Sequence, residues 1–481
     1  VVDAYVGPIT EKYLNRIAIK AVSKGITTPG IFIMQSSGGI MHIKAGAKYP
    51  VQTALSGPAA GGVAAAYLAN ASGLGNYVVS YDMGGTSTDV SLIVDGRLRL
   101  TTEGEIGGQD IGIPMRDIRT IGAGGGTIAW IDASNTLRVG PHSAGADPGP
   151  ACYDRGGAEP TVTDANLLLG YLNADSFLGG RMTIKPSLAE KAVARIARPL
   201  GMDVLTASDA ILKLAESNME VAIRLTIMEK GYDPRVFKLV AFGGAGPLHA
   251  SRMLKNLGVR EMLIPRYPGL TCAVGLLMAD VEHHYMQSLL RPLKNIPIKD
   301  LNGLYSDLQQ RATRDIETEG FDIKEVQFIR QIDLRYVGQG YELTVPAPPK
   351  RFREEDKLTV REVFDAEHLR VYAANAPDID VEVVNLRLVA VKTTPKFPLE
   401  EKSPGPKSAD NALVGHRRVF FREAGWIEKT PVFNRVGLVS GNQVAGPAII
   451  EQEDSTVVVC PGQVAEVDRF ENIIIRVTEV S

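Results

Sequence analysis

The segment best suited to chemistry is Asp82-Met-Gly-Gly-Thr-Ser-Thr-Asp89, in which two carboxylates flank glycines and hydroxyl side chains. Glycines let backbone N–H groups approach phosphate oxygens, and hydroxyls add donors. A carboxylate there can orient a magnesium-bound water, so Asp82 and Asp89 are the candidate catalytic residues, with Asp82 in the Mg²⁺ shell. The alternative is a tight β-turn with hydroxyl caps. The phosphate donors are expected to be five residues of this turn: Gly84, Gly85, Thr86, Ser87 and Thr88.

Alternating helices and strands must position this turn. A strand is expected at 77–80, and Asp95-Gly96 between alternating apolar runs predicts a hairpin. Upstream, Ser56-Gly57-Pro58 predicts a helix start, because proline suits the first helical turn. Downstream, a strand at 238–241 leads into a second glycine loop that would approach the same ligand. That loop contains Gly243, Gly244, Ala245 and Gly246.

A helix is predicted from about Ser208 to Lys230, capped by Ser208 and ended by Gly231. Beyond residue 290 the pattern gives a polar helix at 298–319, strands at 326–336, 341–345 and 381–392, a solvated charged loop at 346–357 and an exposed linker at 395–410. Short strands alternate with turns after about residue 418. Three regions are therefore expected: residues 1–290, an α+β region at 291–400 and a small β-rich domain at 401–481.

Composition excludes several classes. Lysine and arginine number 52 against 55 aspartate and glutamate, so no basic excess predicts nucleic-acid binding. The apolar stretches are well short of the roughly 20 residues that cross a bilayer, so no membrane association is expected. Three distant cysteines, Cys152, Cys272 and Cys460, suggest neither a disulfide framework nor a thiolate metal site, which fits a reducing cytoplasm. Cys152 is expected to be a buried small residue.

A second polar set, His142, Asp147 and Asp164, could contact substrate or hold Zn²⁺ or Mn²⁺, although its spacing is not a metal motif. A capping role for Asp147 is the alternative. The glycines at 122–126 could bind an anion or simply join two strands. His283 and His284 are expected at the surface.

Several longer strings resemble the hydantoinase A/5-oxoprolinase family, within the ATPase superfamily of actin, sugar kinases and heat-shock chaperones. Besides the turn at 82–89, they are Gln35-Ser-Ser-Gly-Gly39, Ile121-Gly-Ala-Gly-Gly-Gly-Thr127, Pro160-Thr-Val-Thr-Asp-Ala-Asn166, Gly231-Tyr-Asp-Pro-Arg235, Arg335-Tyr-Val-Gly-Gln-Gly-Tyr341, Gly446-Pro-Ala-Ile-Ile450 and the 139–153 segment.

This resemblance implies an α/β fold: an actin-like, ribonuclease H-like ATPase core followed by a β-rich C-terminal domain. Residues 82–89 would be the second phosphate loop, 55–67 the first connecting helix and 243–246 the adenosine loop. The helix at 208–230 would flank adenine, with Lys213 or Glu216 as contacts. The cofactors implied are ATP and Mg²⁺.

The implied activity is that of an enzyme subunit that phosphorylates a small carbonyl or amide substrate, first a cyclic-amide hydrolase of the hydantoinase or oxoprolinase type. A ketone carboxylase subunit and a non-catalytic nucleotide-binding scaffold are the alternatives. A hydantoinase B-like subunit is the partner expected.

One feature departs from the family pattern. Relatives carry a first phosphate loop, an Asp followed by Gly-Gly-Thr, whereas the only carboxylates before Asp82 are Asp3 and Glu11. We therefore expect an N-terminal segment or a separate chain to supply that loop.

Overall fold

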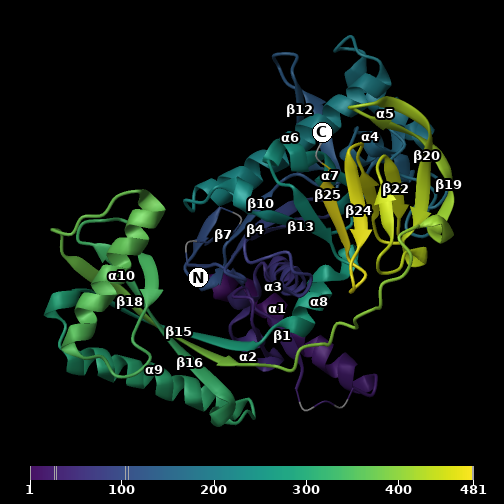
Figure 1. The fold of residues 1–481 in the computed structure, drawn as a ribbon. Helices are drawn as coiled ribbons and strands as arrows, with labels where there is room; N and C mark the ends of the chain where they lie inside the picture. The colour runs from purple at the N-terminus through teal and green to yellow at the C-terminus, as the bar shows by residue number, and fades with distance from the viewer. Residues whose placement is uncertain (1, 27, 29, 103, 107, 479–481) are drawn as a thin grey trace.

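The computed structural model describes residues 2–26, 28, 30–102, 104–106 and 108–478. A nine-stranded sheet forms the centre of the larger part of the molecule (Figure 1), in the order β10-β4-β3-β13-β14-β25-β24-β21, with β5 paired to β4. β13 runs parallel to β3 and β14, and β25 returns antiparallel to β14. The strands are β3 Val78–Met83, β4 Thr88–Val94, β5 Arg97–Leu98, β10 Ile118–Ile121, β13 Lys238–Phe242, β14 Glu261–Ile264, β21 Gln443–Ala445, β24 Gln463–Val467 and β25 Ile473–Val477.

Side chains of β3 alternate between two separate cores, as the period of a strand requires. Val79 and Tyr81 enter the main core with α6 and α7, whereas Val78 packs with α3 on the opposite face. Asp82 shares the face of Val78, which is covered by α3 and α8. These four helices are α3 Ser56–Ala71, α6 Val204–Met228, α7 Gly246–Leu257 and α8 Thr271–Met278.

A six-stranded sheet organises the second part, in the order β1-β2-β15-β18-β16-β17. It has its own core, formed with α9 and α10. Buried Asp333 pairs with Arg387 across two of these strands at 2.7 Å. The elements are β1 Phe32–Met34, β2 Ile40–His42, β15 Val281–Pro292, β16 Val326–Tyr336, β17 Leu343–Pro346, β18 Val381–Lys392, α9 Ile298–Thr318 and α10 Glu354–Tyr372.

A four-stranded sheet, β19-β20-β22-β23, packs into the main core through Val419, Phe421 and the 457–459 segment. Its strands are β19 Leu413–Phe421, β20 Gly425–Asn434, β22 Ala448–Glu451 and β23 Thr456–Val459. The remaining elements are α1 Val2–Ser23, α2 Ile43–Lys48, α4 Val162–Leu168, α5 Pro186–Ala197, β6 Leu100–Thr101, β7 Gly104–Ile106, β8 Gln109–Ile111, β9 Met115–Arg116, β11 Thr127–Ile131 and β12 Leu137–Ser143.

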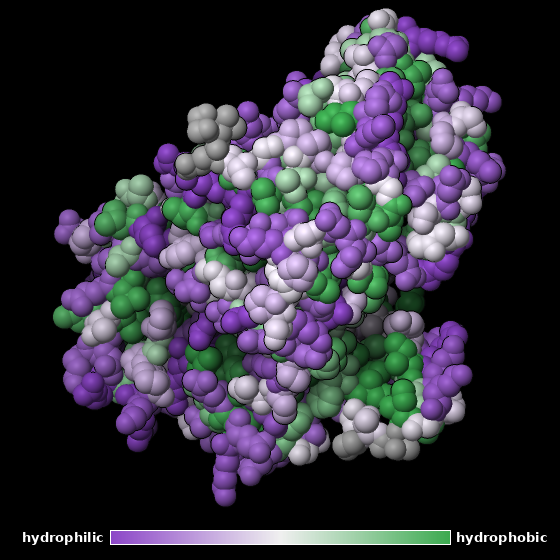
Figure 2. Space-filling model, turned by 45° about the vertical axis from the view of Figure 1, so that its right-hand side comes forward, coloured by the Kyte–Doolittle hydropathy of each residue, from purple (hydrophilic) through white to green (hydrophobic). Residues whose placement is uncertain are grey.

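The fold is thus mixed α/β with β-rich regions. The division at residues 290 and 400 stays a prediction, and the sheets cross both points: β1 and β2 join the six-stranded sheet, while β21, β24 and β25 complete the nine-stranded one. Figure 2 shows hydrophobic residues in small groups among hydrophilic ones on the viewed face. Within the described residues, no helix is long and apolar enough to cross a membrane.

Two element predictions were wrong in part. The helix expected from Ser208 begins at Val204, because Asp203 caps it by accepting from the backbone of Leu205 and Thr206; the Ser208 hydroxyl bonds back within the helix. The charged segment expected as a loop at 346–357 already enters α10 at Glu354. The Asp95-Gly96 hairpin turn is confirmed, with left-handed φ at both residues.

Candidate functional site

Two carboxylates face each other at the end of the β3–β4 hairpin. Asp82 and Asp89 are directly opposed across the two strands. The thiol of Cys272, on α8, donates to Asp82 Oδ2 at 3.3 Å, and the hydroxyl of Thr120, on β10, donates to Asp89 Oδ1 at 2.5 Å. Burial raises the pKa of Asp82 to about 6, and the Asp89 charge adds to the rise. Burial also raises the pKa of Asp89, against the Thr120 hydrogen bond.

The turn between these carboxylates is closed by the Gly84 N–H, which donates to the Ser87 carbonyl at 3.0 Å. Gly84, Gly85 and Thr86 line a cavity, but Ser87 and Thr88 do not. Thr88 is fully buried and its hydroxyl donates to the Ala123 carbonyl at 2.5 Å. The Thr88 hydroxyl, predicted to be a phosphate donor, is therefore already used in a hydrogen bond within the protein.

The glycines at 122–126 join β10 to β11 and stack on the turn. Gly125 N–H donates to the Gly84 carbonyl at 3.0 Å and Gly126 N–H to the Gly85 carbonyl at 2.6 Å. A Cβ on Gly124 would lie 2.6 Å from the Thr86 backbone nitrogen, so only glycine permits this approach. Gly125 and Gly126 also line the cavity. The loop thus joins two strands and contributes to a cavity wall.

The second predicted glycine loop reaches the same place, because β13 lies parallel to β3 and their carboxyl ends meet at one edge of the sheet. Ala245 N–H donates to the Met83 carbonyl at 2.9 Å. Gly243 has φ +80°, and a Cβ there would lie 2.4 Å from Asp82 Oδ1. Gly244 and Ala245 line the cavity, while Gly246 begins α7. The structure therefore brings together two loops more than 150 residues apart.

We call this space the glycine cavity; its volume is about 530 Å³. One side carries backbone of the three glycine loops together with Gly145 and Ala146. The lining also includes apolar side chains, with the polar residues Arg155, Asn173 and Ser176 among them: Pro150, Tyr153, Leu172, Phe177, Leu178, Met182 and Leu248. A backbone-rich end and an apolar end suit a ligand with an anionic group at one end and a flat apolar group at the other.

A third wall, which sequence reasoning missed, is the 451–456 turn between β22 and β23. Asp454 Oδ2 accepts from Gly269 N–H at 2.8 Å. Its Oδ1 atom and the Ser455 hydroxyl are buried without a hydrogen-bond partner among the described residues. Buried polar atoms are normally paired, so these two atoms favour a ligand contact. A polar run of five residues between two apolar strands was the available signal.

Lys213 and Glu216 do not line the glycine cavity. Lys213 is exposed on α6. Glu216 is buried and held by the side chains of Arg252, Arg422 and His249 at 2.5, 2.7 and 3.2 Å. Burial opposes its ionisation, but these neighbours outweigh that cost and hold the pKa of Glu216 well below its usual range. The expected adenine contact from this helix is thus replaced by an ion-pair network.

The set His142, Asp147 and Asp164 is not assembled into one site. His142 and Asp147 are exposed and outside the cavity lining. Asp164 is fully buried and accepts from the backbones of Cys152 and Thr161 and the Thr161 hydroxyl, at 2.7 to 2.9 Å, as the capping box of α4. Nowhere in the described ranges do three His, Cys, Asp or Glu residues form a group that could hold a metal ion.

The two adjacent histidines are not at the surface, contrary to expectation. His283 pairs with Glu319 at 3.0 Å and His284 with Glu282 at 3.3 Å, and their side chains are only 14% and 10% exposed. Each imidazole is therefore partly buried beside a carboxylate, on opposite faces of β15. Cys152 is fully buried, as expected.

The chain belongs to the hydantoinase/oxoprolinase family. It matches this family over residues 1–285 and the hydantoinase/oxoprolinase C-terminal domain over residues 293–478. The resemblance expected from the motifs is thus confirmed.

Particular relatives include a caprolactamase subunit and an acetophenone carboxylase subunit. The chain is 34% identical to the caprolactamase subunit alpha of Pseudomonas jessenii, over 96% of this chain and 67% of the relative. It is also 34% identical to the acetophenone carboxylase gamma subunit of Aromatoleum aromaticum, over 97% and 65%. The crystal structure of the ATP-dependent caprolactamase from Pseudomonas jessenii superposes with a TM-score of 0.86 at 32% identity, covering 99% of this chain and 70% of that one. The chain thus spans about two thirds of the length of these relatives.

Proposed function

We propose that the glycine cavity binds ATP with Mg²⁺ in an actin-like ATPase core, and that the chain uses this ATP to activate a cyclic amide for hydrolysis. The observation that carries the proposal is the convergence of three glycine loops on one cavity, beside the opposed carboxylates of Asp82 and Asp89. An ATP-dependent lactam hydrolase among the relatives supports the same reaction class.

The two ends of the cavity set how the nucleotide would lie. The phosphates would meet the backbone N–H groups of Gly85 and Thr86, which line the cavity where glycine lets an anion approach closely. The adenine would enter the apolar end near Phe177 and Leu172. The unpaired Asp454 Oδ1 and Ser455 hydroxyl are suited to accept from and donate to the ribose hydroxyls, respectively. The adenine would thus be bound by these apolar side chains and not by α6.

The carboxylate pair fits a hydrated Mg²⁺ ion. Asp82 and Asp89 are opposed in a partly buried position, and neither forms an ion pair with a cationic side chain among the described residues. Oxygen ligands and bound waters are what Mg²⁺ prefers. Asp82 would hold the ion through a bound water. Asp89, whose carboxylate is fixed by the Thr120 hydroxyl, would orient other waters bound to the ion. The ion would neutralise charge on the phosphates.

Activation by phosphoryl transfer suits an amide substrate. An amide nitrogen is a poor leaving group. Transferring the γ-phosphoryl group to the amide oxygen would release ADP and give an O-phosphorylated imidate whose carbon water can attack. The adduct would then expel the ring nitrogen as an amine to give an acyl phosphate, which a second water would hydrolyse to the carboxylate and inorganic phosphate. Catalysis then depends on positioning and on charge stabilisation, which the glycine backbone supplies without rearrangement. The opposing phosphate loop would come from another segment or chain, and a hydantoinase B-like subunit would complete the substrate site.

A ketone carboxylase subunit is the second candidate, because the acetophenone carboxylase gamma subunit is as similar in sequence as the caprolactamase subunit. Both chemistries use one activated oxygen, and they differ in whether water or a carboxylate equivalent reacts next. A non-catalytic scaffold is the alternative of another class, and it predicts nucleotide binding without turnover.

Titration of Mg-ATP into Asp82→Ala tests the assignment. We expect binding to be lost, because this carboxylate organises the metal shell. Asp307→Ala is the matched control, since Asp307 is exposed on α9 and outside the glycine cavity. Wild-type affinity in Asp82→Ala would refute the assignment.

Release of ADP, measured with the partner subunit on hydantoin, oxoproline, caprolactam and ketone plus bicarbonate, separates the candidate reactions. Turnover on a cyclic amide alone supports the hydrolase, turnover on ketone and bicarbonate supports the carboxylase, and binding without ADP release on any of them supports the scaffold.

A further inference from the structure

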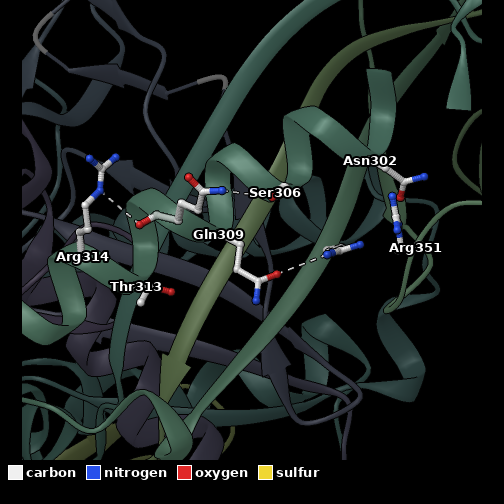
Figure 3. A pocket seen from close by; sticks show the side chains of 8 residues that line it. Asn302, Ser306, Gln309, Thr313, Arg314 and Arg351 are labelled. Carbon is white, nitrogen blue, oxygen red and sulfur yellow. Dashed lines mark hydrogen bonds between the residues drawn. The ribbon is translucent and has the colours of Figure 1, made fainter. Parts of the chain in front are cut away.

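A second cavity lies on the outer face of the six-stranded region, with a volume of about 740 Å³ (Figure 3). It shares no lining residue with the glycine cavity. We call it the arginine cavity. Three of its eight lining side chains are arginines, Arg314, Arg330 and Arg351, and the other five are uncharged hydrogen-bonding residues: Asn302, Ser306, Gln309, Gln310 and Thr313. None of these eight residues carries a carboxylate or an apolar side chain.

The floor of the arginine cavity is the polar face of α9. Its lining positions, from Asn302 through Ser306 to Thr313, recur at helical spacing, whereas the adjoining face buries Leu301, Tyr305, Leu308, Ala312 and Ile316. The lining is therefore fixed by the packing of the helix against its core. Figure 3 shows Arg314 and Arg351 at opposite ends of the row of helix residues.

Arg330 is held in place by several contacts. Its Nη1 donates to the Lys350 carbonyl at 2.6 Å, its Nη2 donates to Gln309 Oε1 at 3.3 Å, and its guanidinium lies 5.0 Å from the centre of the Tyr305 ring. Burial lowers the pKa of Arg330, and no carboxylate offsets that cost. At least three of its five N–H donors remain for a ligand.

The loop that carries Arg351 is clamped on both sides of that residue. Arg330 binds the Lys350 carbonyl, and the Asn302 amide binds both the carbonyl and the N–H of Phe352, at 3.0 and 2.8 Å. The backbone at Arg351 is therefore preorganised, although its side chain is exposed. Neither Arg351 nor Arg314 pairs with a carboxylate among the described residues. Three cationic groups thus surround one concave space without a compensating anion.

We propose that the arginine cavity binds a small polyanion of the phosphorylated-metabolite class, at a site separate from the one that binds ATP. Guanidinium groups match phosphate oxygens through paired N–H donors. The hydroxyl and amide side chains along α9 can form hydrogen bonds with the hydroxyl groups of such a metabolite. An apolar ligand or a peptide anchored by apolar side chains finds no matching surface here.

Calorimetric titration of inorganic pyrophosphate at constant ionic strength tests the proposal. Arg314→Gln combined with Arg351→Gln should weaken binding by about tenfold or more, because two charge-assisted contacts are removed. Arg198→Gln, at an exposed arginine outside both cavities, is the matched control and should bind as the wild type does. Pyrophosphate also suits the glycine cavity, so the readout is the difference between the wild type and the double variant. Equal affinities would overturn the proposal.

Two further arms sharpen the result. Ser306→Glu places a carboxylate in the cavity on an exposed helical position and should abolish the same binding event while the melting temperature stays unchanged. Inorganic phosphate should bind more weakly than pyrophosphate, because it engages fewer of the three arginines. Citrate binding more tightly than pyrophosphate would overturn the assignment to a phosphorylated ligand.

Discussion

At the scale of single residues, Asp82 is placed where an ionised carboxylate is unfavourable. It is largely buried, faces Asp89 across the hairpin and receives only a weak thiol hydrogen bond from Cys272. The backbone of Gly243, just beyond the end of β13, leaves no room for a side chain beside Asp82. Nothing in this arrangement serves stability, so the arrangement favours a role in binding a cation and its ligand.

Asp82→Asn should therefore stabilise the protein in the absence of ATP and Mg²⁺. The pKa of Asp82 is raised in the folded state to about 6. Between about pH 4 and 6 the folded protein therefore holds a proton that the unfolded chain has released, so the stability of the wild type falls as the pH rises through this range. The asparagine variant avoids this loss and should be more stable by about 2 kcal/mol near pH 8, with a much smaller difference near pH 4. Urea unfolding at both pH values measures it. A variant less stable than the wild type near pH 8 would contradict the prediction.

Residue types and spacing were sufficient to find the parts of the site that are local in sequence. Gly84, Gly85 and Thr86 are consecutive in one turn, so their joint place in the cavity lining follows from the sequence alone. The ion-pair network around Glu216 could not be predicted in this way, because its partners Arg252 and Arg422 are 36 and 206 residues away in the sequence. The Asp454 contribution was hidden for the same reason, since tertiary packing alone brings it to the cavity.

At the scale of elements, the strands were predictable where local patterning is strong and the boundaries failed where a cap or a tertiary contact decides them. The β3–β4–β5 hairpins follow from alternation and Asp95-Gly96. α10 was missed because its first turn is highly charged, and the charges that suggested a solvated loop instead cap the helix at Asp356. α1 also lacked a predicted counterpart; only Leu14 among its residues is buried.

Gly243→Ala tests how tightly the β13 loop must approach β3. The residue has φ +80°, and the new Cβ would lie 2.4 Å from both Asp82 Oδ1 and the Met83 carbonyl oxygen. We expect a loss of about 3 kcal/mol in unfolding free energy and much weaker ATP binding. The backbone strain of a left-handed alanine and the steric clash of its Cβ both contribute to these losses. Denaturant titration and calorimetry measure the two effects.

Gly73→Ala is the matched control for backbone strain alone. Gly73 has φ +70°, but a Cβ there would meet nothing within 4 Å. It should cost only about 1 kcal/mol and leave ATP binding intact. Equal losses in the two variants would show that the close approach to Asp82 has no role.

At the scale of the whole molecule, distant segments combine into single layers. β25 pairs with β14 from Glu261 to Ile264, and its isoleucines Ile473 and Ile475 lie in the main core. The same C-terminal region supplies the 451–456 wall of the glycine cavity. By contrast, residues 393–407, between β18 and the C-terminal strands, have no regular secondary structure. The two sheets are therefore connected here by irregular backbone.

Limited trypsin digestion should cut after Lys402 or Lys407 first, because both lie in that irregular segment. The two fragments should still co-elute in size-exclusion chromatography without denaturant, since the β14–β25 pairing and the shared core remain. Added Mg-ATP should slow any further cleavage. Fragments that separate under native conditions would contradict the role given to β25.

The pairing of β25 with β14 also orders events during synthesis. Residues 261–264 leave the ribosome about 200 residues before 473–477, so at translation rates of roughly 5–20 residues per second the β14 edge waits tens of seconds for its neighbour. An open apolar edge of that duration is a binding site for a chaperone and a hazard for aggregation. Ribosome-bound chains halted between these two strands should therefore recruit holdases, and those extended past Val477 should release them.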